Sequence, residues 1–179
     1  MTNSHYEAID AWDELISKLY GEDGKCRIEK LIERMELGLV NWLPKWTILI
    51  GPPRTGKSTL ISIIWKMFEG QELFVAGFMP YDLGQYNGIL GVCHDGDVNH
   101  MYKEIKENWK LSTDYHLLVA TNKEPTVDIQ ESHEIIRPTG NIVNLNRYVD
   151  LMEIISKGIP ELNLYFCEKA SADFIERSL

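Results

Sequence analysis

The sequence predicts an α/β protein with a mostly parallel sheet, on three observations. A glycine-rich phosphate-binding motif stands at residues 51–58, between an apolar run and a helix-forming stretch. Further apolar runs of strand length alternate with longer stretches of helical or turn character. Long connections are what parallel strands need, because only antiparallel neighbours can be joined by a tight turn. With 179 residues, the chain is long enough for one domain with a sizeable core.

The motif is the segment GPPRTGKS, followed by a threonine, and it matches the P-loop pattern G-x-x-x-x-G-K-[ST]. In that geometry, backbone N–H groups converge on a phosphate at the positive end of a helix. Lys57 would reach the β- and γ-phosphates, and the Ser58 hydroxyl would hold Mg²⁺. The motif therefore predicts ATP and Mg²⁺ as cofactors. The predicted nucleotide-binding residues are Gly51, Arg54, Thr55, Gly56, Lys57, Ser58 and Thr59.

The remaining elements place this motif in a three-layer P-loop NTPase. Residues 1–44 are predicted as an N-terminal helical cap, with helices over 6–20 and 28–39 and a turn at 21–24. Residues 45–179 form the predicted ATPase core, with C-terminal helices, in one compact unit with the cap. Its five expected strands lie at 46–50, 73–78, 89–93, 116–120 and 141–145. Its expected helices cover 57–68, 99–109, 148–157 and the tail from 161, with a loop over 126–138.

Two strand ends carry candidate catalytic side chains. A P-loop ATPase needs an acid that positions Mg²⁺ and the attacking water, normally at the end of a neighbouring parallel strand. Asp95 follows a strand that ends in an acidic pair with Asp97, whereas Asp82 follows the strand before it. Asn122 ends the next strand, where an amide can bind both the γ-phosphate and the attacking water. An Asp or Asn after a strand can also be a simple turn former.

The composition limits the partners and the compartment. The chain has 18 basic and 27 acidic residues, a net charge of −9, which argues against a broad nucleic-acid-binding surface. Any such contact is therefore expected to be local or assembled in an oligomer. No apolar run is long enough to span a membrane, and the polar start is no signal peptide. The scattered cysteines, Cys26, Cys93 and Cys167, fit free thiols in a reducing, intracellular compartment.

Taken in order, these motifs resemble the superfamily-3 helicases, the AAA+-related ATPase modules of small DNA virus replication proteins. The resemblance rests on GPPRTGKS (51–58), LFVAGFMPYD (73–82), GILGVCHDGD (88–97) and LLVATN (117–122), and covers about residues 45–145. It implies that Lys57 and Ser58 bind ATP and Mg²⁺, that Asp95 is the Walker B acid and also a metal ligand, and that Asn122 is the sensor-1 asparagine. It further implies an arginine finger that acts on the neighbouring subunit's ATP. Arg137 is the best match for that finger, with Arg147 as the second choice.

The same resemblance implies partners and a location. Members of the family act as hexamers on nucleic acid, so we expect a homo-oligomer that contacts single-stranded nucleic acid in replication or packaging. The expected location is the cytoplasm or the nucleus of a host cell.

The chain departs from the family in two respects. The usual acidic pair is His94-Asp95 here, which leaves Asp97 or His94 as alternatives for the base that activates water. The interval before Asn122 is also short for the family's DNA-gripping hairpin. The basic residues of that interval are Lys103, Lys106, Lys110 and His116, and a solvated helix face is the simpler interpretation of the lysines.

Two other functions compete with an oligomeric ATPase. A small-molecule or nucleotide kinase shares this size and motif, but needs arginines that close over the phosphates. The chain lacks an arginine-rich lid segment, and a kinase does not explain the ATN strand end. A nucleotide-gated binding module with little hydrolysis is the third interpretation, which the His94 departure leaves open.

Overall fold

The computed structural model describes residues 4–69, 74–76, 88–92, 97–107, 115–141 and 143–178 of the chain. The helices are α1 (Ser4–Glu36), the 3-10 turn η1 (Val40–Trp42), α2 (Lys57–Phe68), α3 (Val98–Glu107), α4 (Leu145–Lys157) and α5 (Ile159–Ser178). The strands are β1 (Trp46–Ile50), β2 (Phe74–Ala76), β3 (Gly88–Val92), β4 (Tyr115–Thr121) and β5 (His133–Ile136). The structure is mixed α/β, as the sequence predicts.

The strands form one small sheet in the order β2-β3-β4-β1-β5, and every pair in it is parallel. Three strands of five to seven residues, β3, β4 and β1, make up its centre. The edge strands β2 and β5 are shorter, with three and four residues. Every residue of β1 and β4 is buried, which is typical of parallel strands covered on both faces. The 51–58 motif therefore begins at the carboxyl end of an inner strand.

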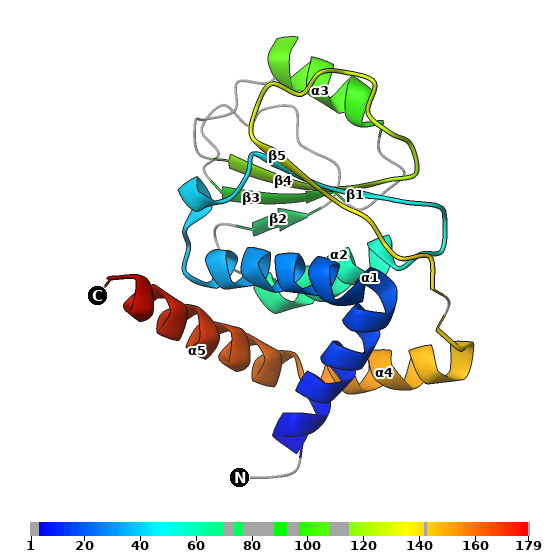
Figure 1. Cartoon of the computed structure of the whole chain (residues 1–179), viewed down its shortest axis with the longest axis vertical. Coiled ribbons are helices and arrows are strands. Elements are labelled where there is room, and N and C mark those ends of the chain that lie inside the picture. The colour runs from blue at the N-terminus through cyan, green and yellow to red at the C-terminus, as the bar shows by residue number, and fades with distance from the viewer. Residues whose placement is uncertain are drawn as a thin grey trace.

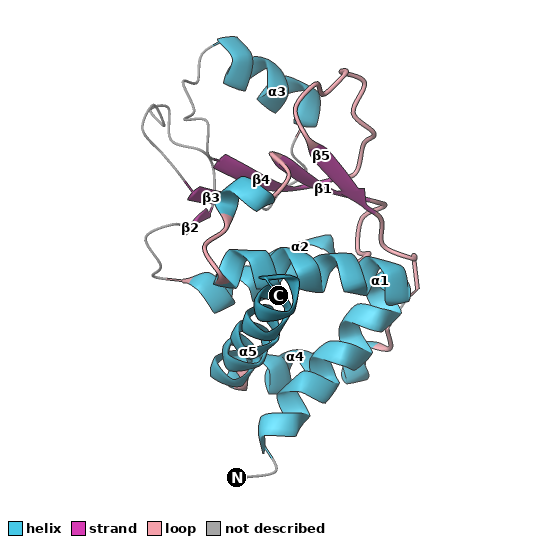
Figure 2. Cartoon of the chain, turned by 60° about the vertical axis from the view of Figure 1, so that its left-hand side comes forward, coloured by secondary structure: helices cyan, strands magenta, loops and turns pink. Residues whose placement is uncertain are grey.

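Helices cover the two faces of the sheet unequally (Figures 1 and 2). One face carries α3, whose Val98, Tyr102 and Ile105 pack with alternate residues of β1 and β4. The other face carries α2, with α1, α4 and α5 beyond it, in the larger of the two apolar cores. In that core the Trp12 and Phe166 rings of α1 and α5 meet edge to face, with centroids 5.4 Å apart. Both helices therefore belong to the same apolar layer.

The last predicted strand is wrong. The described residues of this stretch, 141 and 143–145, form no strand: Leu145 begins α4, and the Asn144 side chain accepts hydrogen bonds from the backbone N–H groups of Asn146 and Arg147. Asparagine is a strong helix-capping residue, so the apolar residues before it lead into a helix instead. The last strand is β5, which lies inside the predicted loop 126–138 and pairs along β1. Because β5 lies at the edge of the sheet and is partly exposed, its sequence carries polar residues and does not read as an apolar strand.

The helical segment before β1 is continuous apart from one residue. We expected a helix, a turn at 21–24 and a second helix, but only Gly21 leaves the helical conformation, with φ 70° and ψ 174°. A positive φ is readily available to glycine because it has no Cβ. Gly21 therefore kinks α1 without a longer turn. None of the described helices is both long and apolar enough to cross a membrane.

Candidate functional site

The 51–58 loop is anchored at both ends by its backbone. At its start, the Gly51 N–H donates to the carbonyl of Thr121 at the end of β4, at 3.3 Å. At its end, Gly56 precedes α2 with φ 89°, and a Cβ there would lie 2.6 Å from Leu19 Cδ1. Arg54 also has a positive φ, 64°, which is uncommon for a residue with a Cβ. The motif thus forms a tight strand-to-helix connection in which glycine is required at position 56.

Lys57 is buried, with only 6% of its surface exposed. Its ammonium donates to the carbonyls of Gly51 and Pro52, at 2.6 and 2.7 Å. The Thr55 hydroxyl donates to the same Pro52 carbonyl at 2.8 Å. The positive charge is therefore held close to the first two residues of its own loop.

A cleft of about 600 Å³ opens beside the loop. Five of the predicted nucleotide-binding residues line it: Arg54, Gly56, Lys57, Ser58 and Thr59. Gly51 and Thr55 do not line it and serve the loop's own hydrogen bonds. The cleft lies within the 300–1,000 Å³ range usual for small-molecule sites. Its volume is suited to a ligand as large as a nucleotide.

Asn122 lines the same cleft from the end of β4. The preceding residue forms a tight turn there: the Lys123 N–H donates to Thr121 Oγ1 at 3.2 Å, and that hydroxyl donates to the Lys123 carbonyl at 3.3 Å. Thr121 is buried, so this turn is fixed by the sheet. The structure therefore brings Asn122 and Lys57 to one cleft, as the sequence predicts for strands whose carboxyl ends share an edge.

Within the described part of the chain, none of the predicted acidic residues is seen in the cleft lining. Asp95, with His94 and Asp82, lies outside the described residues. Asp97 is exposed, and its Oδ1 accepts from the backbone N–H groups of Asn99 and His100, at 3.0 and 3.2 Å. Asp97 therefore caps the start of α3, a structural task that fully accounts for an aspartate there.

An Mg²⁺ ion would find one predicted ligand in the cleft. The Ser58 side chain is exposed, lines the cleft and offers a hydroxyl oxygen, the hard donor that Mg²⁺ prefers. Among the described residues, no group of three or more His, Cys, Asp or Glu side chains gathers into a metal site. The Ser58 oxygen fits such an ion, and the predicted acid partner, Asp95, belongs to a segment that is not described.

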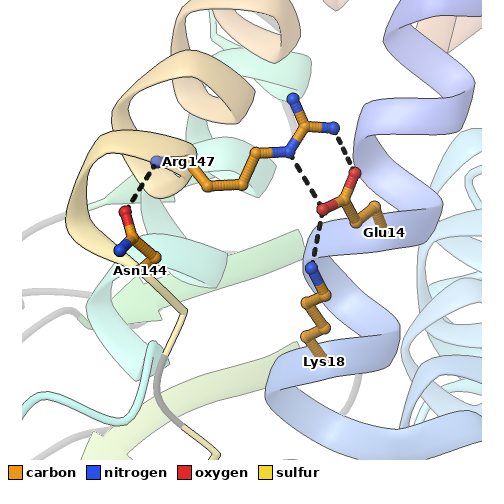
Figure 3. A network of polar contacts seen from close by, with 4 residues as sticks. All are labelled: Glu14, Lys18, Asn144 and Arg147. Carbon is orange, nitrogen blue, oxygen red and sulfur yellow. Dashed lines mark hydrogen bonds and ion pairs between the residues drawn. The ribbon is translucent and has the colours of Figure 1, made fainter.

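The two candidate arginine fingers lie outside the cleft lining. Arg137 follows β5, is half exposed and makes a bidentate ion pair with Glu124, at 2.5 and 3.0 Å. Arg147, in the first turn of α4, pairs with Glu14 of α1, which also accepts from Lys18 (Figure 3). The hydrogen bonds from Arg147 and Lys18 lower the pKa of the Glu14 carboxyl to about 2. Both arginines therefore neutralise carboxylates of their own chain.

The described basic residues between positions 95 and 122 differ in exposure: the lysines are exposed and His116 is buried. Lys103 and Lys106 are exposed on α3, and the Lys106 ammonium lies 4.6 Å from the centre of the Tyr102 ring. Lys110 lies outside the described residues. His116 is fully buried in β4, its Nδ1 bonds the Pro44 carbonyl, and burial lowers its pKa to about 4. His116 therefore cannot grip a nucleic acid from this position, because no part of its side chain reaches solvent.

Part of the cleft was missed in the sequence. Leu19 of α1, Asn141, Val143 and Tyr148 all line it. The hydroxyl groups of Tyr148 and Thr59 share a hydrogen bond of 2.7 Å, which ties α4 to α2 at the cleft. Nothing in the sequence near these residues indicates a binding role, since Leu19 has the spacing of a core residue of a helix and residues 141–145 have the pattern of a strand.

The comparisons give no relative from which a role could be transferred. No model of a known protein family and no curated protein sequence matches this chain.

Proposed function

We propose that this protein is a P-loop ATPase that binds ATP with Mg²⁺ and hydrolyses it. The observation that carries the proposal is the buried Lys57 ammonium, held at a nucleotide-sized cleft that it shares with Asn122. A fixed positive charge at the start of a helix is suited to phosphate. Asn122 follows β4, the strand that pairs with β1, and its amide is suited to hold a water and a phosphate oxygen at the same cleft.

Each side chain has a distinct task in this mechanism. Lys57 and the backbone N–H groups at the start of α2 bind and orient the phosphates, so that charge developing on the transferred group meets donors already in place. Asn122 orients the attacking water, as a glutamine does in related phosphoryl-transfer enzymes. Mg²⁺, when bound, would neutralise charge on the phosphate oxygens, with the Ser58 hydroxyl and the Asp95 carboxylate holding it.

We also propose that the ATPase works as a homo-oligomer on single-stranded nucleic acid, in the manner of the superfamily-3 helicases that its motifs resemble. We place it inside the cell, in the cytoplasm or a host nucleus. Exposure of Arg137 beside the strand ends supports a role toward a neighbouring subunit. The net charge of −9 limits the nucleic-acid contact to a few phosphates per subunit.

The first experiment measures phosphate release from ATP–Mg²⁺ and, in parallel, particle mass by size exclusion with light scattering, with and without the nucleotide. We expect turnover and a larger particle in the presence of ATP. A strict monomer that transfers the phosphoryl group to a small acceptor would identify a kinase instead. Binding without turnover in any assembly would leave a nucleotide-gated binding module.

The second experiment measures anisotropy of a labelled single-stranded oligonucleotide against salt. We expect weak binding that is lost between low and physiological salt, because few phosphates are neutralised. Reversing the charge of Lys103 or Lys106 should weaken it and leave ATP turnover intact. An unchanged salt profile in both variants would show that α3 faces solvent alone.

A further inference from the structure

The N-terminal helix reaches the cleft at its kink. Leu19, two residues before Gly21, lines the cleft and lies against Gly56, the last loop residue before α2. The neighbouring Tyr20 is buried, and its hydroxyl donates a long hydrogen bond of 3.4 Å to the Gly56 carbonyl. The kink of α1 therefore forms one wall of the site around the phosphate-binding loop.

Thr139 holds that kink from the other side. Its backbone N–H donates to the Leu19 carbonyl at 2.8 Å. Its hydroxyl lies 3.0 Å from the Lys18 carbonyl and 3.2 Å from the Leu19 carbonyl, so one proton is shared between them. These carbonyls lie at the end of the first half of α1, just before the non-helical Gly21, and the last carbonyls of a helix need partners from outside it. Thr139 thus caps a helix that lies 120 residues earlier in the sequence.

The segment that carries Thr139 continues directly into the cleft. Asn141, two residues later, lines it, and so does Asn144 at the start of α4. The Asn141 N–H donates to the Thr139 hydroxyl oxygen at 3.2 Å, so the residue that holds the kink also holds a residue of the cleft wall.

We propose that Thr139 is a positioning residue that fastens the kink of α1 to the nucleotide cleft. Nucleotide binding then stabilises the hydrogen bonds between Thr139 and the kink, which we call the closed kink. This inference rests on the proposed binding of ATP. A ligand that fills the cleft fixes Gly56 and Leu19 and favours the closed kink. Breaking the hydrogen bonds of the kink lowers the affinity for the ligand by the same factor by which the ligand favours those bonds, because coupling between two sites is reciprocal.

The test compares Thr139→Val, which keeps the shape and loses the hydroxyl, with Thr139→Ser, which keeps the hydroxyl. ATP–Mg²⁺ affinity is measured by equilibrium dialysis. We expect Thr139→Val to bind roughly three- to tenfold more weakly, because it loses the hydroxyl's bond to the Lys18 and Leu19 carbonyls and the bond that its oxygen accepts from the Asn141 N–H, at 3.2 Å. Thr139→Ser should bind as the parent protein does. Hydrogen exchange at residues 18–24 should slow on addition of ATP in the parent and in Thr139→Ser, and less in Thr139→Val.

Each outcome decides the question. If the parent binds ATP but exchange at residues 18–24 is unchanged by it, the coupling is wrong and the proposed function stands; this measurement needs no variant to fold. Equal affinity in all three proteins would also overturn the inference. If the parent does not bind ATP, the proposed function fails and the inference falls with it.

Discussion

Two stretches that follow neighbouring strands of the sheet are held in opposite ways. The side-chain donors of the loop after β1 bond within the loop: Lys57 and Thr55 donate to carbonyls at most six residues away. The segment after β5 is held by residues outside it, 13 to 133 positions earlier in the chain. Arg137 pairs with Glu124, Thr139 caps α1, and Arg147 pairs with Glu14, 133 residues earlier.

The difference also concerns charge and exposure. In the first stretch, the cation is buried and bonds loop carbonyls, so solvent and salt screen its interactions little. In the second, exposed guanidinium groups face carboxylates at the surface, where screening weakens each pair. The loop after β1 is therefore suited to fixed binding, and the segment after β5 to contacts that can be exchanged.

Removing the buried cation should have the largest effect. In Lys57→Ala we expect ATP turnover to fall by at least about a hundredfold, because the charge that meets the phosphates is lost. The rise in melting temperature that ATP gives the parent should disappear, since a ligand stabilises only the state that it binds. Without nucleotide, the cost should be about 1–3 kcal/mol, because the Gly51 and Pro52 carbonyls lose a donor.

The matched control is Lys66→Ala, which removes an exposed lysine of the same helix whose ammonium bonds Ser156. It should leave turnover and the ATP-induced shift unchanged. Equal ATP-induced shifts in the parent and in Lys57→Ala would show that the loop does not bind the nucleotide.

Replacing Asn122, at the end of the strand beside β1, should slow hydrolysis without weakening ATP binding. We expect Asn122→Ala to lower kcat by roughly ten- to a hundredfold, because the attacking water loses its orienting group. The dissociation constant of ATP should stay within about twofold, since Lys57 still binds the phosphates. Single-turnover hydrolysis and equilibrium dialysis separate these quantities. Asn146→Ala, an exposed asparagine of α4, is the control. A large loss of affinity in Asn122→Ala would show that the amide binds ground-state ATP.

Arg137 should act across a subunit boundary. We expect Arg137→Ala to lower turnover about tenfold or more with little change in affinity, because an arginine finger stabilises charge that develops only during transfer. Mixing it with Lys57→Ala subunits, which keep the arginine, should restore part of the activity. Absence of rescue at every mixing ratio would place the role of Arg137 within its own subunit. Arg147→Ala, tested in the same mixtures, shows whether the second candidate is the finger.

The exposed pairs should give the smallest effect, and it should depend on pH. Arg147 and Lys18 lower the pKa of Glu14 from 4.5 to about 2. A lowered carboxyl pKa stabilises the fold above the unfolded value, and the contribution is lost as pH falls from about 4.5 toward about 2. The small difference in unfolding midpoint between the parent and Glu14→Gln should therefore shrink over that interval, and salt should reduce it at neutral pH. A difference that persists at pH 2 would mean that packing of Glu14 matters more than its charge.

The same contrast explains what the sequence could predict. The loop from Gly51 to Thr59 was recognisable because all its determinants are contiguous: an apolar strand, a glycine with positive φ, and a lysine that begins a helix. Asn122 was found because parallel strand ends meet at one edge. The parallel direction of the strands followed from the same apolar runs and the long connections between them, whereas their order in the sheet was not predicted.

The cleft's other wall could not be predicted in this way. Leu19, Thr139 and Tyr148 gain their roles only from contacts across the fold, so no local pattern marks them. The strand expected at 141–145 failed because Asn144 caps α4, a local signal that was outweighed by the apolar residues around it. The His116 contact with Pro44 shows the converse case, in which a polar residue that suggested a surface role is satisfied inside the sheet.

The edge-to-face contact between Trp12 and Phe166 has a consequence for synthesis. A ribosome releases α1 long before α5, so the Trp12 ring, whose N–H can already bond Glu29 of the same helix, lacks its aromatic partner until α5 has emerged. Folding of this layer must therefore wait for long-range closure, which slows it and leaves an apolar surface open to chaperones or self-association in the meantime. A nascent chain that stalls before α5 would carry the whole 51–58 loop and a Trp12 ring that Phe166 does not cover.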